Sequence, residues 1–511
     1  MDGVENWQRQ SEVILIGANQ KNYMKVLGWE IKREKKTGLS PSEQKAYFDL
    51  RKRYYEAADK GRRGKAFARV KSTGPNIEIV SALTELRSRS RHMVRNNGWA
   101  KRAVEAIVKN TVGEGIRPAP LGTISVNKKV KTIWREWAET TACDWYGKST
   151  FYGLQEMAMR SIAEGGDIIV ILRRTQPQRE DELPIKIQLC EGDMIDHSKN
   201  GVNEQGVARL GVQYSNEGEL LGYWLWDSHP GDMGFYGLGL RQSEFHKKED
   251  ILHVFEILRI GQSRGLPFGV AGFMKMSDFS DYEDAQLFKQ KVAAMFCAFV
   301  TGNEESIPEE GIVDKMEPGM IEYLGLGEEI AFANPPTVGD YDTYSTRILQ
   351  GVASSYGITY EMLTMDFSRV NFTSGRMAFL TVINNFRSWQ YGMMVPQFCQ
   401  PIWEWFMDAC LVAGFLHKRV KTDFTAPRIQ HLDPVKETNA MVLQIQAGLT
   451  TWSETVRELG RDPIEFIEEV KQEREMLIAA GINFSSIILA PDIPEEPANN
   501  QNNNNEQEKN Q

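Results

Sequence analysis

The segment GITYEMLTMDFSRVNFTSGRMA, residues 357–378, interrupts a pattern that is helical on both sides. Its central part, residues 359–376, is polar, rich in small residues and free of any repeating apolar spacing. Residues 340–357 predict an amphipathic helix, because apolar side chains recur every three or four positions at Tyr341, Tyr344, Ile348, Val352 and Tyr356. Residues 377–415 are dense in Phe, Trp and Met and predict a long helix kinked at Pro396. The central prediction is therefore a polar loop between two helices.

A further helix is predicted upstream, over residues 268–301, from an apolar stripe formed by Phe288, Val292, Met295 and Phe299. Its first half carries Asp278, Asp281 and Asp284 at a spacing of three, which places these carboxylates along one helix flank. Paired carboxylates bind Mg²⁺ in some nucleases. An exposed acidic helix flank is more often simply solvated.

The stretch between these two helices, residues 303–336, is acidic and punctuated by Pro and Gly, which predicts a small irregular or β-rich insertion. Over Asn303–Asp342, eleven acidic residues accompany a single base, Lys315.

In the amino-terminal half, the spacing of apolar residues changes from every three or four positions to every second position. This change predicts an α+β domain over residues 120–262. Helices are expected at 81–110, 131–141 and 153–164, and strands at 168–172, 185–189, 207–214, 220–226 and 251–257. Residues 216–219 supply a hairpin turn between two of these strands.

The two ends of the chain differ in composition from the segments between them. Residues 1–71 are polar and basic, whereas residues 434–481 predict two or three short helices. Residues 491–511 hold seven Asn and three Gln with few apolar side chains, which is typical of disorder.

Composition and charge narrow the class of protein. Of 511 residues, 41% are hydrophobic and 25% charged, which is typical of a soluble, core-forming chain. The longest apolar runs, such as Ile168–Leu172, are far shorter than the ~20 residues of a membrane helix.

Residues 1–110 hold 24 Lys and Arg against 12 Asp and Glu, a net charge of +12, and the remainder carries −21. Such asymmetry favours contact with nucleic acid or a segregated assembly surface.

No pattern of catalytic residues emerges. The sequence lacks a GxxxxGK[ST] phosphate loop and an HExxH motif, and its five cysteines include no CxxC pair. We therefore expect no catalytic residue, no cofactor and no metal. Three alternatives stay open from the residues alone: a metal-dependent nuclease or ATPase, a structural assembly protein, and a nucleic-acid-binding protein that uses the basic amino-terminal region.

Several segments, taken together, resemble the lambda-type portal proteins of tailed bacteriophages. They occur in family order and cover most of residues 80–480: RSRSRHMVRNNGWAKRAVEAIVKNTVGEGIRP (87–118), WREWAETTACDW (134–145), GQSRGLPFGV (261–270), DYEDAQLFKQKVAA (281–294), GITYEMLTMDFSRVNFTSGRMA (357–378) and DPVKETNAMVLQIQAGLTTWSETVRELGRDP (433–463).

The resemblance implies a mainly helical α+β portal fold assembled as a ring, normally of twelve copies. Its parts would be a basic arm (1–75), a wing (76–265), a first stem helix (266–302), a clip (303–338), a second stem helix (339–358), a tunnel loop (359–376), a long wing helix and return (377–430), crown helices (431–490) and a disordered tail (491–511).

The resemblance also implies partners. These are further copies of the chain, double-stranded DNA in the channel, the terminase large subunit, the major capsid or scaffold protein, and head–tail connector proteins, with no membrane. The expected location is the portal vertex of the virion, after assembly in the host cytoplasm.

Local chemistry fits a conduit for DNA. Acidic side chains such as Asp278, Asp281 and Asp284, repeated around a ring, would repel phosphate and keep a duplex centred. The polar groups expected to touch the DNA backbone transiently are those of the loop: Arg369, Asn371, Thr373, Ser374 and Arg376. The two arginines could instead pair with Asp366, Glu361 or a neighbouring subunit. For the series Arg87, Arg89, Arg91 and Arg95, the expected role is salt bridging between subunits.

Overall fold

The computed structural model describes residues 23–26, 29–32, 72–177, 179–180, 182–232, 242–294, 298–301, 329–332, 341–427, 434–461 and 463–481. The chain forms two compact units, Met1–Thr73 and Gly74–Gln511. In the first unit, strands β1 (Tyr23–Val26) and β2 (Trp29–Lys32) pair antiparallel. Apart from these strands and residues 72–75, the predicted basic arm lies outside the described residues, as does the whole predicted tail.

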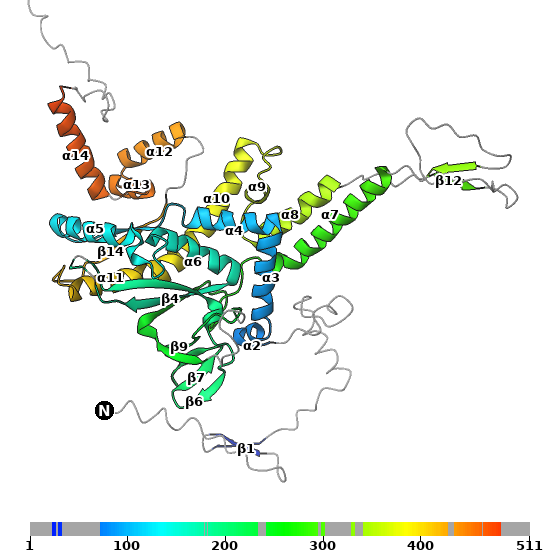
Figure 1. The fold of residues 1–511 in the computed structure, drawn as a ribbon, viewed down its shortest axis with the longest axis horizontal. Coiled ribbons are helices and arrows are strands. Elements are labelled where there is room, and N and C mark those ends of the chain that lie inside the picture. The colour runs from blue at the N-terminus through cyan, green and yellow to red at the C-terminus, as the bar shows by residue number, and fades with distance from the viewer. Residues whose placement is uncertain are drawn as a thin grey trace, which may run out of the picture. The chain divides into compact units, whose positions relative to one another are not determined.

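The second unit begins with five helices and contains a small three-stranded sheet (Figure 1). These are α2 (Pro75–Val80), α3 (Leu83–Asn96), α4 (Gly98–Thr111), α5 (Ile124–Ala138) and α6 (Phe151–Gly165). The sheet has the antiparallel order β11-β4-β5, built from β4 (Asp167–Arg174), β5 (Ile185–Glu191) and β11 (Ile251–Phe255).

The central strand β4 is buried on both faces, which explains its continuous apolar run. Ile168 and Val170 join the main core with the helices, whereas Ile169 and Ile171 join a second cluster with the neighbouring sheet. That sheet has the order β10-β9-β8-β7-β6, comprising β6 (Gly201–Asn203), β7 (Gly206–Arg209), β8 (Val212–Tyr214), β9 (Leu220–Trp226) and β10 (Ser243–Lys247).

Two predicted elements are divided in the structure. The strand predicted over 207–214 is a pair of strands, because Leu210 and Gly211 both have positive φ, 53° and 81°, and turn the chain back. The helix predicted over 81–110 breaks at Asn97, whose backbone is extended. The Asn97 side chain accepts hydrogen bonds from the backbone N–H groups of Trp99 and Ala100 and so caps α4. Apolar spacing continues across this break, so periodicity alone missed it.

The main core is rich in aromatic side chains. Trp134 and Trp137 of α5 pack against Phe406, with ring centroids 4.9 and 5.4 Å apart, and Trp134 also contacts Trp403 and Phe151. These contacts join α5 and α6 to the long helical stretch of α10 (Phe372–Trp389), the π-helical segment η8 (Gln390–Cys399) and α11 (Gln400–Val412).

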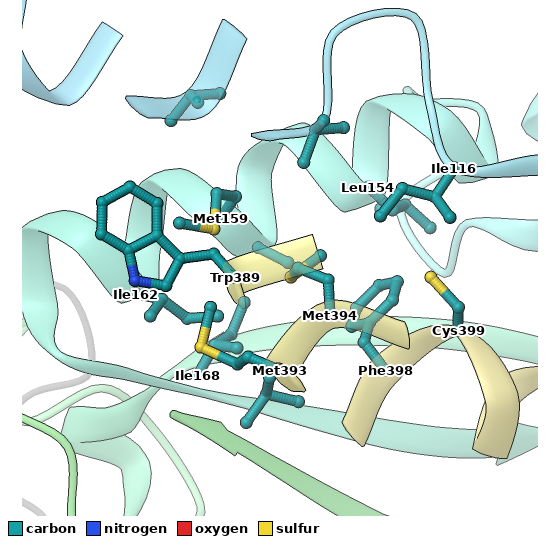
Figure 2. Close-up of a cluster of buried hydrophobic side chains, with 14 of the residues drawn as sticks. Ile116, Leu154, Met159, Ile162, Ile168, Trp389, Met393, Met394, Phe398 and Cys399 are labelled. Carbon is teal, nitrogen blue, oxygen red and sulfur yellow. The ribbon is translucent and has the colours of Figure 1, made fainter. Parts of the chain in front are cut away.

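Pro396, where the sequence predicts a kink, lies inside the π-helical segment. A wider turn accommodates a residue that has no N–H to donate. Figure 2 shows side chains from this segment meeting those of α6 and β4: Met393, Met394 and Phe398 against Leu154, Met159, Ile162 and Ile168.

Helices α7 (Phe273–Ala294) and α8 (Tyr341–Ser355) pack side by side (Figure 1). The Tyr282 ring stacks on Tyr341, with centroids 6.0 Å apart, and lies 4.5 Å from that of Tyr344. The predicted helix over 268–301 is too long at both ends. It starts at Phe273, and Ala298–Thr301 forms strand β12, which pairs antiparallel with β13 (Glu329–Phe332). The sequence AFVT, with one aromatic and two β-branched residues, favours the strand. Of the predicted insertion over 303–336, only β13 lies within the described residues.

The carboxyl-terminal part returns to the body and then forms three short helices. Strand β14 (Thr422–Thr425) pairs with β3 (Arg117–Pro120). Helices α12 (Pro434–Gln446), α13 (Trp452–Glu458) and α14 (Pro463–Ala479) follow, as predicted over 434–481. Thr451 caps α13, and Gly460 and Gly481 follow α13 and α14 with φ of 78° and 74°. No helix in the described ranges is long and apolar enough to cross a membrane.

A buried charge network joins these layers at Asp167, the first residue of β4. Its Oδ2 accepts hydrogen bonds from Arg264 Nε at 2.8 Å and from the backbone N–H of Gly265 at 3.3 Å, and contacts His253 Nε2 at 3.1 Å. Its Oδ1 pairs with Arg87 of α3, whose Nε donates to the carbonyl of Gly165. All four charged or titratable side chains are at least 96% buried.

Close packing around Asp167 depends on two glycines. A Cβ at Gly192 would lie 1.6 Å from Asp167 Oδ1. Gly166 has φ of 94°, and a Cβ there would meet the backbone of Gly265 at 2.7 Å. The network therefore has no room for larger residues at either position.

The network also corrects the expected role of the arginines in α3. Arg87 is buried within one subunit, and Arg91 pairs with Glu191 at 2.7 Å and with Asp193 at 2.6 Å. Arg89 forms an exposed pair with Glu85, one helical turn away. The expectation that the series bridges subunits is therefore wrong for Arg87 and Arg91.

Replacing Asp167 tests the importance of this network. Asp167→Asn leaves buried Arg264 with no carboxylate partner among the described residues and leaves Arg87 only Asp193, 3.9 Å away, so we expect a loss of about 3–5 kcal/mol of unfolding free energy. Arg89→Ala, which removes only an exposed pair, should cost less than about 1 kcal/mol. Urea unfolding followed by tryptophan fluorescence measures both values. Equal effects of the two variants would contradict the central role of Asp167.

The network also predicts acid sensitivity. Burial lowers the pKa of His253, and although burial alone would raise the pKa of Asp167, Arg264 and Arg87 hold it well below its usual range. Below about pH 6.5 the unfolded chain therefore binds a proton at residue 253 that the folded chain does not, and below about pH 4 the same holds for residue 167. Stability should fall as the pH falls through both windows.

His253→Gln should lose less stability than the wild type between pH 7 and pH 5, because it removes the first of these protons. The matched control is His417→Gln, at an exposed position. Urea midpoints at several pH values test this, and identical pH profiles for wild type and His253→Gln would refute it.

Candidate functional site

The polar stretch that the sequence predicts as a loop over 359–376 is largely helical at its ends. Helix α9 (Tyr360–Thr364) occupies its start, and α10 begins at Phe372. The connection without helical structure is therefore residues 365–371.

Two capping interactions set the boundaries of this connection. Thr359 Oγ1 accepts a hydrogen bond from the N–H of Met362 and caps α9. Asn371 Oδ1 accepts from the N–H of Ser374 at 2.8 Å, and Ser374 Oγ accepts from the N–H of Asn371 at 3.2 Å, which is a reciprocal capping box. Asn371 and Ser374, predicted as DNA-contacting groups, thus hold the start of α10. The spacing N-x-x-S was the signal that could have indicated this role.

The loop itself is shaped by local hydrogen bonds and held by α4. Met365 has φ of 58°, which ends α9. Asp366 accepts a hydrogen bond from the backbone N–H of Ser368, and hydrogen bonds from Ser368 lower the pKa of this carboxyl. Arg102 of α4 donates from Nε to the carbonyl of Met362 at 3.1 Å. Because Arg102 is distant in sequence, no local pattern could have identified it as a residue that positions the loop.

The two loop arginines pair with carboxylates outside the predicted choices. Arg369 pairs with Asp342, at the start of α8, and both side chains are more than half exposed. Arg376, in the first turns of α10, lies 3.7 Å from Glu437 of α12. The suggested partners Asp366 and Glu361 are not used for ion pairs within the described residues. Thr373 is exposed in the first turn of α10.

The acidic flank of α7 is where the sequence places it. Asp278, Asp281 and Asp284 are all exposed, whereas Met276 and Phe279 on another side of the helix are buried. Within the described ranges no basic side chain pairs with these three carboxylates, and no ion pair joins them to Arg369 or Arg376. The structure thus presents a solvated acidic flank and a separate loop carrying arginines.

One acid–histidine group among the described residues has the spacing of a metal site. Ligand atoms of Glu191, Asp193 and His229 lie within 4.8 Å of one another. Arg91 already binds both carboxylates, so a cation would have to displace a guanidinium. The three α7 carboxylates do not form such a group.

A cavity of about 660 Å³ separates α10 from α12 and α13. Arg376 and Glu437 lie at its border, and Phe379, Leu380 and Met441 contribute apolar lining. The Arg376–Glu437 pair therefore connects α10 with α12 at the edge of this cavity.

Comparison with known proteins gives one consistent result. Residues 60–390 match the family described as phage portal protein, lambda family. The chain is 21% identical over 425 residues to the probable portal protein of Halomonas phage phiHAP-1, covering 78% of this chain and 81% of the relative. It is 23% identical over 483 residues to portal protein B of Escherichia phage lambda, covering 81% and 88%. The portal protein of Escherichia phage N15 is 24% identical over 464 residues, covering 78% and 85%.

Among solved structures, the chain is similar to one in the neck of a native gene transfer agent particle computed with C12 symmetry. The TM-score is 0.42 at 13% identity, covering 74% of this chain and 93% of the other.

Capping and ion pairing at this site should have separable effects on stability. Asn371→Ala removes the cap of α10 and should cost about 1 kcal/mol of unfolding free energy. Arg369→Ala removes an exposed ion pair and should change it by less than about 1 kcal/mol. Urea unfolding measures both. A large loss in Arg369→Ala would show that this arginine is structural and would remove the reason to assign it a ligand.

Proposed function

This chain belongs to the lambda family of phage portal proteins, and we propose that its copies close into a ring through which DNA enters and leaves the capsid. As a portal protein it is a structural component of a phage particle. The ring, the passage of DNA and the individual partners belong to the proposal.

The proposed assignment of parts follows the order of elements. Helices α7 and α8 form the stem, and the strand pair β12–β13 belongs to the clip. The body built around β4 is the wing, and α12–α14 form the crown. The tunnel loop narrows from the sequence-based 359–376 to residues 365–371, because α9 and α10 take up its ends.

The observation that carries the proposal is the separation of acidic and basic exposed groups. A ring would repeat Asp278, Asp281 and Asp284 around its axis as bands of negative charge. Such bands repel phosphate, so a duplex gains no counterion-release affinity there and can slide. A DNA channel needs this weak affinity, because strong binding would stop the DNA from moving.

In this proposal only Arg369 and Arg376 provide cationic contacts for DNA in the tunnel loop region. Both already pair with exposed or partly exposed carboxylates, Asp342 and Glu437. An exposed ion pair contributes little to stability, so a passing phosphate can replace the carboxylate at low cost. Asn371 and Ser374 support this arrangement by fixing where α10 begins, and Thr373 stays a candidate contact.

The proposed partners follow the assigned parts. The clip would bind the terminase large subunit and later the head–tail connector proteins, and the wing would contact the major capsid or scaffold protein. The chain itself would have no enzymatic activity. A nuclease would need carboxylates open to a cation, and the one candidate group in the described ranges is bound by Arg91.

Ring formation is tested directly on the purified full-length chain. We expect native mass spectrometry and negative-stain electron microscopy to show closed rings of about a dozen copies with a central hole. Small oligomers that stay open even when shell and scaffold proteins are added would refute the channel.

The role of the loop is tested by Arg369→Glu together with Arg376→Glu. We expect intact rings but fewer DNA-filled heads, because repulsion replaces the transient phosphate contacts. The matched control is Arg89→Glu with Arg174→Glu, since these arginines are also exposed and each pairs with one carboxylate. Quantifying packaged DNA in purified heads distinguishes the two. Normal yields from the loop variant would remove DNA contact from the loop.

A further inference from the structure

Helix α5 begins beside the segment of residues 417–421, and several hydrogen bonds hold the two together. The N–H of Leu121 donates to the carbonyl of Lys421 at 2.8 Å, and β3 and β14 pair next to this point. The N–H of Gly122 donates to Asn127 Oδ1 at 2.8 Å. Trp403 Nε1 donates to the carbonyl of Val420 at 2.9 Å. Figure 1 shows α5, β14 and α11 together at this side of the unit. The surface is therefore built on a fixed framework.

This surface displays four exposed lysines, Lys128 and Lys129 from α5 and Lys418 and Lys421 from the segment beside it. None of them pairs with a carboxylate among the described residues. Within the two segments that carry these lysines, residues 117–131 and 417–425, the one acidic residue is Asp423, which is exposed, and nearby Asp408 of α11 is held by Arg419 at 2.5 Å. The four lysines carry a charge of +4 and Asp423 carries −1, so the surface has an excess of three positive charges. The chain as a whole has a net charge of −9.

The helix end adds to this positive charge. The first turn of α5 contains no acidic residue, although the amino terminus of a helix favours one. Lys128 and Lys129 follow in the next turn instead. The partial positive charge of the helix terminus and the lysines are thus left for an external anion to balance.

Two large apolar residues neighbour these lysines: Leu121 is hydrogen-bonded to the backbone of Lys421, and Ile124 lies one helical turn before Lys128. Leu121 is 53% exposed and Ile124 is 62% exposed. We call these six residues, Leu121, Ile124, Lys128, Lys129, Lys418 and Lys421, the lysine patch. Its mixture of positive charge and apolar area is typical of a protein-docking surface with a charged rim.

We infer that the lysine patch docks an acidic protein segment that also carries apolar side chains, supplied by another protein of the capsid. The inference rests on the proposed function and names a site for one of its partners. Carboxylates would meet the lysines, and an apolar side chain would cover Leu121 and Ile124. DNA is the weaker fit, because phosphates gain nothing from the apolar side chains.

The first experiment uses full-length chains in cells that supply the remaining head proteins of the particle. Lys128→Glu with Lys129→Glu should reduce the number of copies per purified head at least fivefold, as measured by quantitative mass spectrometry. The matched control, Lys247→Glu with Lys248→Glu, reverses another adjacent pair of lysines and breaks only the exposed Lys248–Glu219 contact. It should enter heads normally.

Ring formation separates this inference from the proposed function. Native mass spectrometry should show rings for the wild type and both variants, which also shows that the patch variant folds. Wild-type chains that form no ring and enter no head would overturn the proposed function, and this inference with it. Rings in all cases, with equal entry of the patch variant into heads, would overturn the inference alone.

The second experiment identifies what covers the patch. A carbodiimide activates a carboxylate, and a lysine amine then displaces the urea by-product to form an amide bond. In intact heads we expect such amides between Lys128, Lys129, Lys418 or Lys421 and Asp or Glu residues of another head protein. Amides only to other copies of this chain would overturn the inference. Binding of a labelled DNA duplex that weakens in Lys128→Glu with Lys129→Glu, but not in the control, would assign the patch to nucleic acid and also overturn it.

Discussion

The buried carboxylate of Asp167 is the interaction on which the body of this protein depends. It pairs with both Arg87 and Arg264, and it joins helix α3, strands β4 and β11 and the backbone at Gly265. A buried ion is costly to desolvate, so the arrangement persists only because each charge has a partner. The strand that Asp167 begins carries the two apolar clusters on its faces, and the helices pack against one of them.

The proposed DNA-contacting region is positioned by helix capping rather than by burial. Thr359 caps α9, while Asn371 and Ser374 cap α10, and Arg102 secures the end of α9 from α4. These contacts leave seven residues, 365–371, to connect two helices that belong to the packed body. In the proposed channel, a short connection with fixed ends would keep its place as DNA passes, and its exposed Arg369 could still exchange partners.

The distribution of charge separates three surfaces, for which we propose different uses. The α7 flank is acidic and solvated, the loop arginines pair with single carboxylates, and the lysine patch has no partner among the described residues. A ring built from this chain would repel DNA along one surface, contact it briefly at a second and hold an acidic protein at a third. A structural component needs no catalytic group for any of these roles.

The sequence by itself determined what depends on neighbouring residues. Apolar spacing identified α8 and, with bounds that were too wide, α7; helix start and stop residues identified the helices within 434–481, the alternation at Ile185–Leu189 identified β5, and the quoted segments identified the family. Only the tertiary structure decided how distant residues combine. Arg87 is buried against Asp167, 80 positions away, and Arg369 pairs with Asp342 rather than with nearby Asp366. Local patterns specify which face of an element is apolar, but the partner of a charge depends on how the elements pack.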